Sequence, residues 1–202
     1  MNYYELYTKS MHQALTGMMV TNLAGEILNP EHSFDLWREW THELKTQGRF
    51  CFFVGNGASA TMASHMAVDA TKNAGIKAMT FNEASFLTAI GNDIGYEEVF
   101  ELPLKRYGHQ GDLLTTISSS GNSPNVVRAI ACARAVGIRV VTLSGMKPGN
   151  KSRSAGDLNY YIPASTYGIV ESAHAVLLHC WMDHLMNIKE WEPTAARAIS
   201  AV

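Results

Sequence analysis

Charged side chains are scarce in this chain, and long apolar runs are absent. Only 17% of its 202 residues are charged while 47% are hydrophobic, which argues against a disordered or strongly solvated protein. With 16 basic against 18 acidic side chains, no charge excess is available to attract nucleic acid or an anionic membrane. No apolar run is long enough to span a bilayer, and Glu5, Lys9 and His12 interrupt the place of a signal peptide's apolar core. We therefore expect one soluble, cytoplasmic domain.

Cysteine is also rare. The chain has three cysteines, Cys51, Cys132 and Cys180, which lie far apart in apolar runs. Because no CxxC pair is present, the sequence gives no sign of a cysteine-based zinc site or redox motif. We expect three buried thiols in a reducing compartment.

The hydrophobic pattern changes near Gly48. Before this residue, apolar side chains recur at steps of three to four, which predicts a helical N-terminal arm over residues 1–48 with a second helix over 30–45. This arm is too apolar to extend freely, so we expect it to pack on the core or on a neighbouring subunit. Residues 191–202 are expected to form a frayed tail.

After Gly48, short apolar runs rich in β-branched residues alternate with helical segments over residues 49–190. Such runs are typical of strands that are covered on both faces, and their alternation with helices predicts right-handed crossovers. The expected strands are residues 50–54, 76–81, 112–117, 139–143 and 158–162. The predicted fold class is α/β, a doubly wound, mostly parallel five-stranded sheet flanked by helices, with an N-terminal helical arm.

Two loops that follow strands carry residues typical of a ligand site, because ligands of open α/β sheets bind beyond the carboxyl ends of strands. The first loop, GNGASA at residues 55–60, combines glycines that allow a tight turn with the side-chain donors Asn56 and Ser59. It also matches the GxGxxA dinucleotide fingerprint, which expects a ribose-binding acid at the end of the next strand, about 20 residues on. The nearest acid, Glu83, comes later and is predicted to open a helix, which disfavours a dinucleotide site.

The second loop is rich in serine. It reads SSSGNSP at residues 118–124, with Ser123 in place for an N-cap and Pro124 for the first position of a helix. Hydroxyls, a glycine and a helix N-terminus together make a cradle for a phosphate monoester that needs no arginine. The alternative is a serine-rich cap without a ligand. The number of serines, at the same sheet edge as the first loop, favours phosphate binding, and the candidate ligands are Ser118, Ser119, Ser120 and Ser123.

Two helices carry polar pairs that are suited to chemistry. His65 and Asp69 are spaced i, i+4 and share one helix face, so they can chelate a divalent ion, form an acid–base couple, or make a local structural contact. Glu171 and His179 are separated by about 12 Å of helical rise, so their spacing alone does not make them ligands of one ion.

Several further segments complete a recognisable set. They are AIGND at residues 89–93, GDLL at 111–114, VVTLSG at 140–145, and a last helix with His174 and His179. Together with GNGAS and SSSGNS, they resemble the sugar isomerase (SIS) domain family, most closely its phosphoheptose isomerase branch, over residues 52–187. The resemblance implies an aldose–ketose isomerase that converts sedoheptulose 7-phosphate to a manno-heptose 7-phosphate through an enediolate. It also implies a homotetramer with active sites at subunit contacts.

The resemblance assigns roles to single residues. The serine loop, with Ser59, would hold the substrate phosphate, and Asn56 and Asp93 would lie near the sugar. Asp69 and His179 map to the acid–base pair of the branch, and Glu171 maps to a substrate contact. The implied ligands of a divalent metal, zinc in this branch, are His65, Asp69, Glu171 and His179.

Three positions depart from the branch. Asp69 replaces a glutamate and sets the carboxylate back by about 1.5 Å, and misplacement by an ångström can cost on the order of 100-fold in rate. Glu171 replaces a glutamine and adds a negative charge that would strengthen a cation site, and Gly168 replaces an aspartate beside the sugar. Two alternatives therefore stay open. One is a non-catalytic tetrameric regulator that binds a replication initiator or another protein, and the other is a phosphosugar-sensing module.

Overall fold

A twisted sheet of seven strands runs through the molecule, in the order β2-β1-β7-β6-β5-β3-β4. The structure is a computed structural model and describes residues 1–192. Five strands are mutually parallel: β3 (Phe50–Gly55), β4 (Lys77–Thr80), β5 (Leu113–Ser118), β6 (Arg139–Gly145) and β7 (Leu158–Ile162). Each lies within two residues of its predicted position at either end, which confirms the doubly wound α/β fold.

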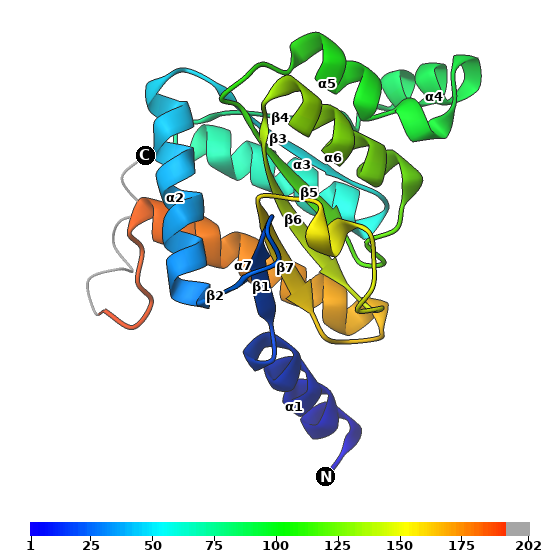
Figure 1. Cartoon of the computed structure of the whole chain (residues 1–202). Coiled ribbons are helices and arrows are strands. Elements are labelled where there is room, and N and C mark those ends of the chain that lie inside the picture. Colours follow the sequence, from blue (N-terminus) through cyan, green and yellow to red (C-terminus); the bar gives the residue numbers. More distant parts are fainter. Residues whose placement is uncertain (193–202) are drawn as a thin grey trace.

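Helices cover both faces of the sheet (Figure 1). One face packs under α2 (Pro30–Thr46), α3 (Ala58–Lys72) and α7 (Tyr167–Met186), and the other under α4 (Ala84–Asp93), α5 (Glu101–Tyr107) and α6 (Pro124–Val136). The described residues also form two short 3-10 helices, η1 (Tyr96–Glu98) and η2 (Ser152–Ser154). Along β5, Leu113 and Ile117 pack into the first layer and Leu114 into the second, as the two-residue period of a strand requires.

The prediction of a helical N-terminal arm, with a break only near residues 22–25, was wrong over residues 19–28. Helix α1 (Tyr3–Thr16) is followed by β1 (Met19–Asn22) and β2 (Ile27–Leu28), which form an antiparallel hairpin, and β1 pairs antiparallel with β7. Strands of four and two residues are too short to show a two-residue period, so their apolar side chains resemble a continuation of the helical pattern. Gly25, with φ of +82°, turns the chain between them.

Asn159 ties this hairpin to the sheet. Its buried Oδ1 accepts hydrogen bonds from the Thr142 hydroxyl at 2.9 Å and the Gly156 N–H at 2.8 Å, and its Nδ2 donates to the carbonyls of Gly156 and Thr21. Because each buried polar group left without a partner costs about 1–3 kcal/mol, we expect Asn159→Ala to lower the free energy of unfolding by about 3 kcal/mol. Urea unfolding followed by circular dichroism measures this change. Asn92→Ala, at an exposed site, is the control, and a loss below about 0.5 kcal/mol for Asn159→Ala would contradict this role.

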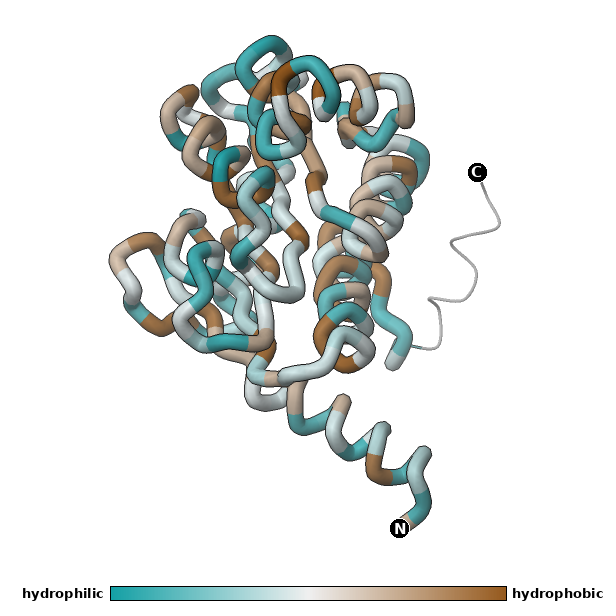
Figure 2. Tube along the Cα trace, turned by 90° about the vertical axis from the view of Figure 1, so that its right-hand side faces the viewer, coloured by the Kyte–Doolittle hydropathy of each residue, from teal (hydrophilic) through white to brown (hydrophobic). Residues whose placement is uncertain are grey.

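Helix α1 projects from the body of the molecule, as Figures 1 and 2 both show. It contacts α7 and buries Ala14, while Tyr3, Tyr4 and Leu6 remain exposed. Helix α1 therefore contacts its own molecule through part of its length only, and the side chains of its first turn remain exposed. Most of the tail predicted at residues 191–202 lies outside the described residues.

Cys51 and Cys132 are buried free thiols, as predicted, but Cys180 is exposed. It lies in an apolar run on α7, and that run is longer than the stripe of the helix that faces the sheet. Among residues 1–192, no helix has the length and apolar character to cross a bilayer.

Candidate active site

The glycine-rich and serine loops lie side by side at one edge of the sheet. Because β3 and β5 are parallel neighbours, with Gly55 opposite Ile117, the loops that follow them leave the sheet together. They form a pocket of about 260 Å³, to which the first turns of α7 also contribute. The lining residues are Asn56, Gly57, Ala58, Ser59, Ile117, Ser118, Ser119, Ser120, Ser123, Tyr167 and Glu171.

Backbone conformation at two glycines shapes the loops. Gly57 has φ of +57° immediately before α3, and Gly121 has φ of +62° within the serine loop. A Cβ at position 121 would overlap the side chain of Asn150, so only glycine fits there. Ser123 is the N-cap of α6 and Pro124 its first residue, as predicted, but the Ser123 hydroxyl does not cap the helix. It lies 3.5 Å from the Ser118 hydroxyl instead.

The chemistry of this pocket suits an oxyanion. Ser59, Ser118 and Ser119 are buried, and the Ser119 hydroxyl has no hydrogen-bond partner among residues 1–192. Helices α3 and α6 begin at its rim, where the positive ends of the helix dipoles favour negative charge. Among the lining residues within the described chain there is no lysine or arginine, so hydroxyl and backbone donors would bind a phosphate here.

His65, Asp69 and His179 form a second group on the outer faces of α3 and α7. The His65 Nε2 lies 3.3 Å from the Asp69 Oδ2, and the rings of His65 and His179 have centroids 5.6 Å apart. None of the three lines the serine pocket, from which Asp69 is separated by about two to three turns of α3. The structure thus joins three of the four residues that the sequence proposed as metal ligands. The fourth, Glu171, faces the serine pocket.

Two other sequence expectations have different outcomes. Asp93 is exposed at the end of α4, where Asn92 Nδ2 donates to its carboxylate at 2.8 Å, and it does not line the pocket. Glu83 is the N-cap of α4 and accepts from the backbone N–H groups of Ser85 and Phe86. It is thereby occupied as a helix cap, which further disfavours a dinucleotide site.

The four proposed metal ligands do not fit a metal site in their present arrangement. Within residues 1–192, no three His, Cys, Asp or Glu side chains are grouped so that they could hold one ion. The Asp69 carboxylate contacts His65 through one oxygen and Asn73 Nδ2, at 3.4 Å, through the other.

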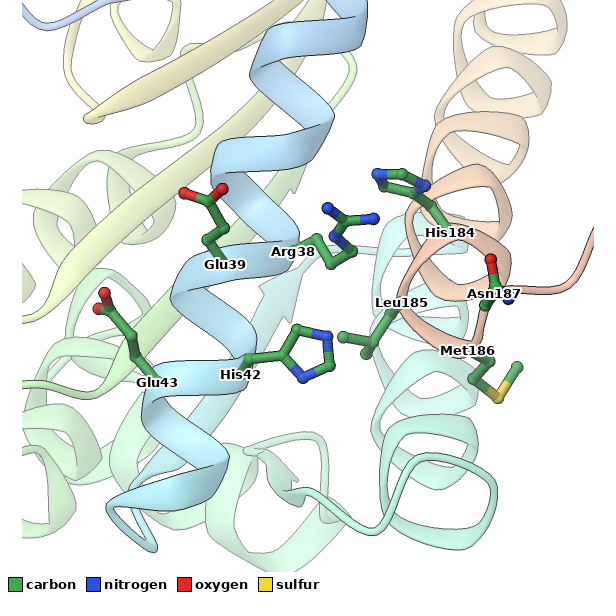
Figure 3. A pocket seen from close by; sticks show the side chains of 8 residues that line it. All are labelled: Arg38, Glu39, His42, Glu43, His184, Leu185, Met186 and Asn187. Carbon is green, nitrogen blue, oxygen red and sulfur yellow. The ribbon is translucent and has the colours of Figure 1, made fainter.

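A larger hollow of about 640 Å³ lies elsewhere, between α2 and the C-terminal end of α7 (Figure 3). Arg38 and His42 extend toward α7, whereas Glu39 and Glu43 extend from the other side of α2. None of the predicted site residues lies there. Its size alone does not make it the active site.

Comparison with known proteins decides the family. Residues 39–145 match the SIS domain, and the chain is 34% identical over 148 residues to the phosphoheptose isomerase of Fusobacterium nucleatum, covering 71% of this chain and 76% of the relative. The chain belongs to the SIS domain family, in its phosphoheptose isomerase branch. It is also 35% identical to the phosphoheptose isomerase of Helicobacter pylori over 146 residues, which are 69% of this chain and 75% of that protein.

Solved structures agree with this SIS assignment. The phosphoheptose isomerase GmhA from Neisseria gonorrhoeae superposes with a TM-score of 0.71 at 30% identity, over 76% of this chain and 86% of that one. A phosphoheptose isomerase from Francisella tularensis shares the fold over 93% of this chain and 100% of its own, with a TM-score of 0.78 at 21% identity.

In this SIS domain, the first turn of α7 has an unusual neighbour. A Cβ at Gly168, where the resemblance implies aspartate, would lie 2.9 Å from the hydroxyl of Tyr7 on α1. The N-terminal helix thus takes up the space of a side chain at position 168. Sequence reasoning missed Tyr7 and the pocket residue Tyr167, because a contact between a helix and a distant loop leaves no local pattern.

Buried His174 anchors α7 to the end of β6 of the SIS domain. One ring nitrogen, Nε2, lies 3.2 Å from the Ser144 carbonyl, and burial lowers the pKa of His174 from its ordinary 6.5 to about 4. In the unfolded chain, the His174 imidazole therefore binds a proton below about pH 6.5. In the folded protein it binds that proton only below about pH 4. We expect the free energy of unfolding to fall by up to about 3 kcal/mol across that interval as the pH drops.

Urea unfolding at several pH values tests this effect. His174→Gln should remove most of the His174 contribution to the pH dependence, whereas His12→Gln, at an exposed site, should keep the wild-type curve. A His174→Gln curve parallel to that of the wild type would contradict the assignment.

Proposed function

We propose that this protein is an aldose–ketose isomerase that converts sedoheptulose 7-phosphate to a manno-heptose 7-phosphate, or acts on a closely related sugar phosphate. The observation that carries the proposal is the pocket where the serine loop meets Asn56 and Ser59 between two helix N-termini. In a chain of the phosphoheptose isomerase branch, that pocket has the chemistry for a phosphate monoester.

Phosphate binding comes first in the proposed reaction. Hydroxyls of Ser59, Ser119 and Ser120 would donate to the phosphate oxygens, beside the positive ends of the dipoles of α3 and α6. Glu171 and Tyr167 also line the pocket, and the sugar would extend along them. Asp93 does not line the pocket, so its place near the sugar stays a prediction of the resemblance.

Proton transfer is assigned to Asp69 and His179. Isomerisation needs a base that removes the proton from one carbon and returns it to its neighbour, and an acid that serves the oxygens of the enediolate. Contact with His65 orients the Asp69 carboxylate, and His179 lies beside the same imidazole. Both residues lie apart from the serine pocket, so the sugar would have to reach them from the bound phosphate.

A second copy of the chain would help to bring these groups together. Exposed Val68 and Val176 lie on α3 and α7, the helices that carry the His65 group, and α1 exposes Tyr3 and Tyr4. These apolar surfaces support the proposed homotetramer with active sites at subunit contacts. Loss of activity on dilution to monomers would agree with it, and a fully active monomer would contradict it. The two buried free thiols suit the cytoplasm, where we propose that the protein works.

Zinc at His65, Asp69, Glu171 and His179 stays a prediction of the resemblance. The experiment is conversion of sedoheptulose 7-phosphate by pure protein, untreated, chelator-treated, and with zinc restored. Turnover that is lost on chelation and returns with zinc would support the metal. Turnover that is unchanged by the chelator would leave Asp69 and His179 as an acid–base pair that needs no metal.

One observation favours a second candidate function, the phosphosugar-sensing module. The separation of the Asp69 group from the serine pocket within one protomer would suit a domain that binds the phosphate but does not catalyse. Binding of sedoheptulose 7-phosphate without turnover in any of the three samples would decide for it. In the described part of the chain, nothing specifically favours the alternative of a regulator that binds a replication initiator.

A further inference from the structure

Asn125, the second residue of α6, joins the two loops that form the pocket. Its side chain and that of Asn56 exchange two hydrogen bonds of 2.9 Å, each amide donating to the oxygen of the other. Asn125 is only 2% exposed and is not among the residues that line the pocket. It can therefore act on a ligand only through Asn56.

The backbone of α6 decides which way this amide pair faces. The N–H of Val126 donates to the Asn125 Oδ1 at 3.0 Å. Because a backbone N–H can only donate, the oxygen of the Asn125 amide must face it, and the NH₂ group must then face Asn56. The orientation of Asn125 in turn fixes the orientation of the Asn56 amide.

The Asn56 side chain has few hydrogen-bonding groups left to offer a ligand. Its Oδ1 accepts from Asn125 Nδ2 and from the hydroxyl of Tyr96 at 3.3 Å, which uses both lone pairs. Its Nδ2 has two hydrogens, and one is donated to Asn125. One N–H therefore remains, so Asn56 can donate to a ligand but cannot accept from it.

We infer that Asn125, assisted by Tyr96, is a positioning residue that presents Asn56 to the bound phosphosugar as a donor toward an acceptor oxygen, either of the phosphate or of the carbonyl. The inference rests on the proposed function, because it needs a phosphosugar in the serine pocket. It adds a residue outside the pocket on which substrate affinity depends.

Asn125→Asp is the decisive variant. A protonated carboxyl both donates and accepts and so preserves the paired arrangement, whereas a carboxylate only accepts, repels the Asn56 Oδ1 and lets the Asn56 amide turn. Burial favours the protonated form as the pH falls. At each pH, kcat/KM of the variant is divided by that of the wild type. We expect this ratio to rise at least about tenfold from about pH 8 to about pH 5, mainly through KM.

Two further variants complete the test. Asn125→Leu should raise KM at least about tenfold, with a ratio that does not change with pH. Asn29→Asp, which replaces one good N-cap of α2 by another, should stay at the wild-type value at every pH. Circular dichroism checks that each variant is folded. A wild-type KM for folded Asn125→Leu, or for folded Asn125→Asp at about pH 8, would overturn the inference.

A measurement without ligand separates this inference from the proposed function. The Asn56 Nδ2 proton that is donated to Asn125 should exchange slowly with water in the wild-type protein and at least about tenfold faster in Asn125→Leu, as nuclear magnetic resonance would show. Equal exchange in both would overturn the inference, whatever the enzyme does. If the Asn56 side-chain proton exchanged slowly but the protein neither bound nor converted sedoheptulose 7-phosphate, the proposed function would be overturned. The inferred pairing of Asn56 with Asn125 would still hold.

Discussion

Asp69→Asn is expected to lower kcat for the sugar phosphate by about 10²–10⁴-fold and to leave KM within a few-fold of the wild type. Asparagine keeps the shape of the side chain but cannot take up the proton that isomerisation moves between two carbons. Because the serine pocket is untouched, the phosphate should still bind. Steady-state kinetics with sedoheptulose 7-phosphate measures both constants.

His179→Gln should lower kcat by a similar factor, because the same proton transfer needs both residues. The double variant should be little worse than either single one, as is typical of groups that act as a unit. Asp183→Asn, at an exposed position on α7 outside the described site, is the matched control and should keep kcat. A loss below about tenfold for Asp69→Asn would remove Asp69 from the mechanism.

Ser120→Asp is expected to raise KM by at least about 100-fold. Ser120 lines the phosphate pocket and is half-buried, so a carboxylate there faces the phosphate while keeping some contact with water. Like charges about 4 Å apart repel by several kcal/mol at the effective dielectric of a protein surface, and two to three kcal/mol already correspond to about 100-fold. Isothermal titration with the sugar phosphate measures the loss directly.

The control for this charge is Ser172→Asp. Ser172 is exposed beside Glu171 and does not line the pocket, so the same added charge should change the affinity only a few-fold. If Ser120→Asp bound the sugar phosphate as tightly as the wild type, the serine loop would not be the phosphate site.

The sequence was sufficient for the features whose determinants are local. Apolar runs predicted the parallel strands, and Pro124 after the serine loop predicted the start of α6. The phosphate cradle at the sheet edge stays a prediction. Position relative to the strands was enough to bring Ser59 and Ser119 together. The β1–β2 hairpin was not predicted, because its strands are very short and depend on pairing with β7 and on Asn159.

Contacts between distant segments could not be predicted. Asn56 pairs with Asn125 across 69 residues and with Tyr96 across 40, and neither bond leaves a spacing pattern in the chain. Helix periodicity placed His65 beside Asp69, but it could not show that His179 would join them while Glu171 faces the serine pocket. Those placements depend on how α3 and α7 pack on the sheet.

The most direct measurement is incubation of the pure protein with sedoheptulose 7-phosphate in deuterated water, with the sugar recovered and analysed by nuclear magnetic resonance. We expect deuterium on the carbon that gains a proton during isomerisation in the wild type, and none with Asp69→Asn. Sugar phosphate that binds to the wild-type protein but gains no deuterium would contradict an isomerase that works through an enediolate.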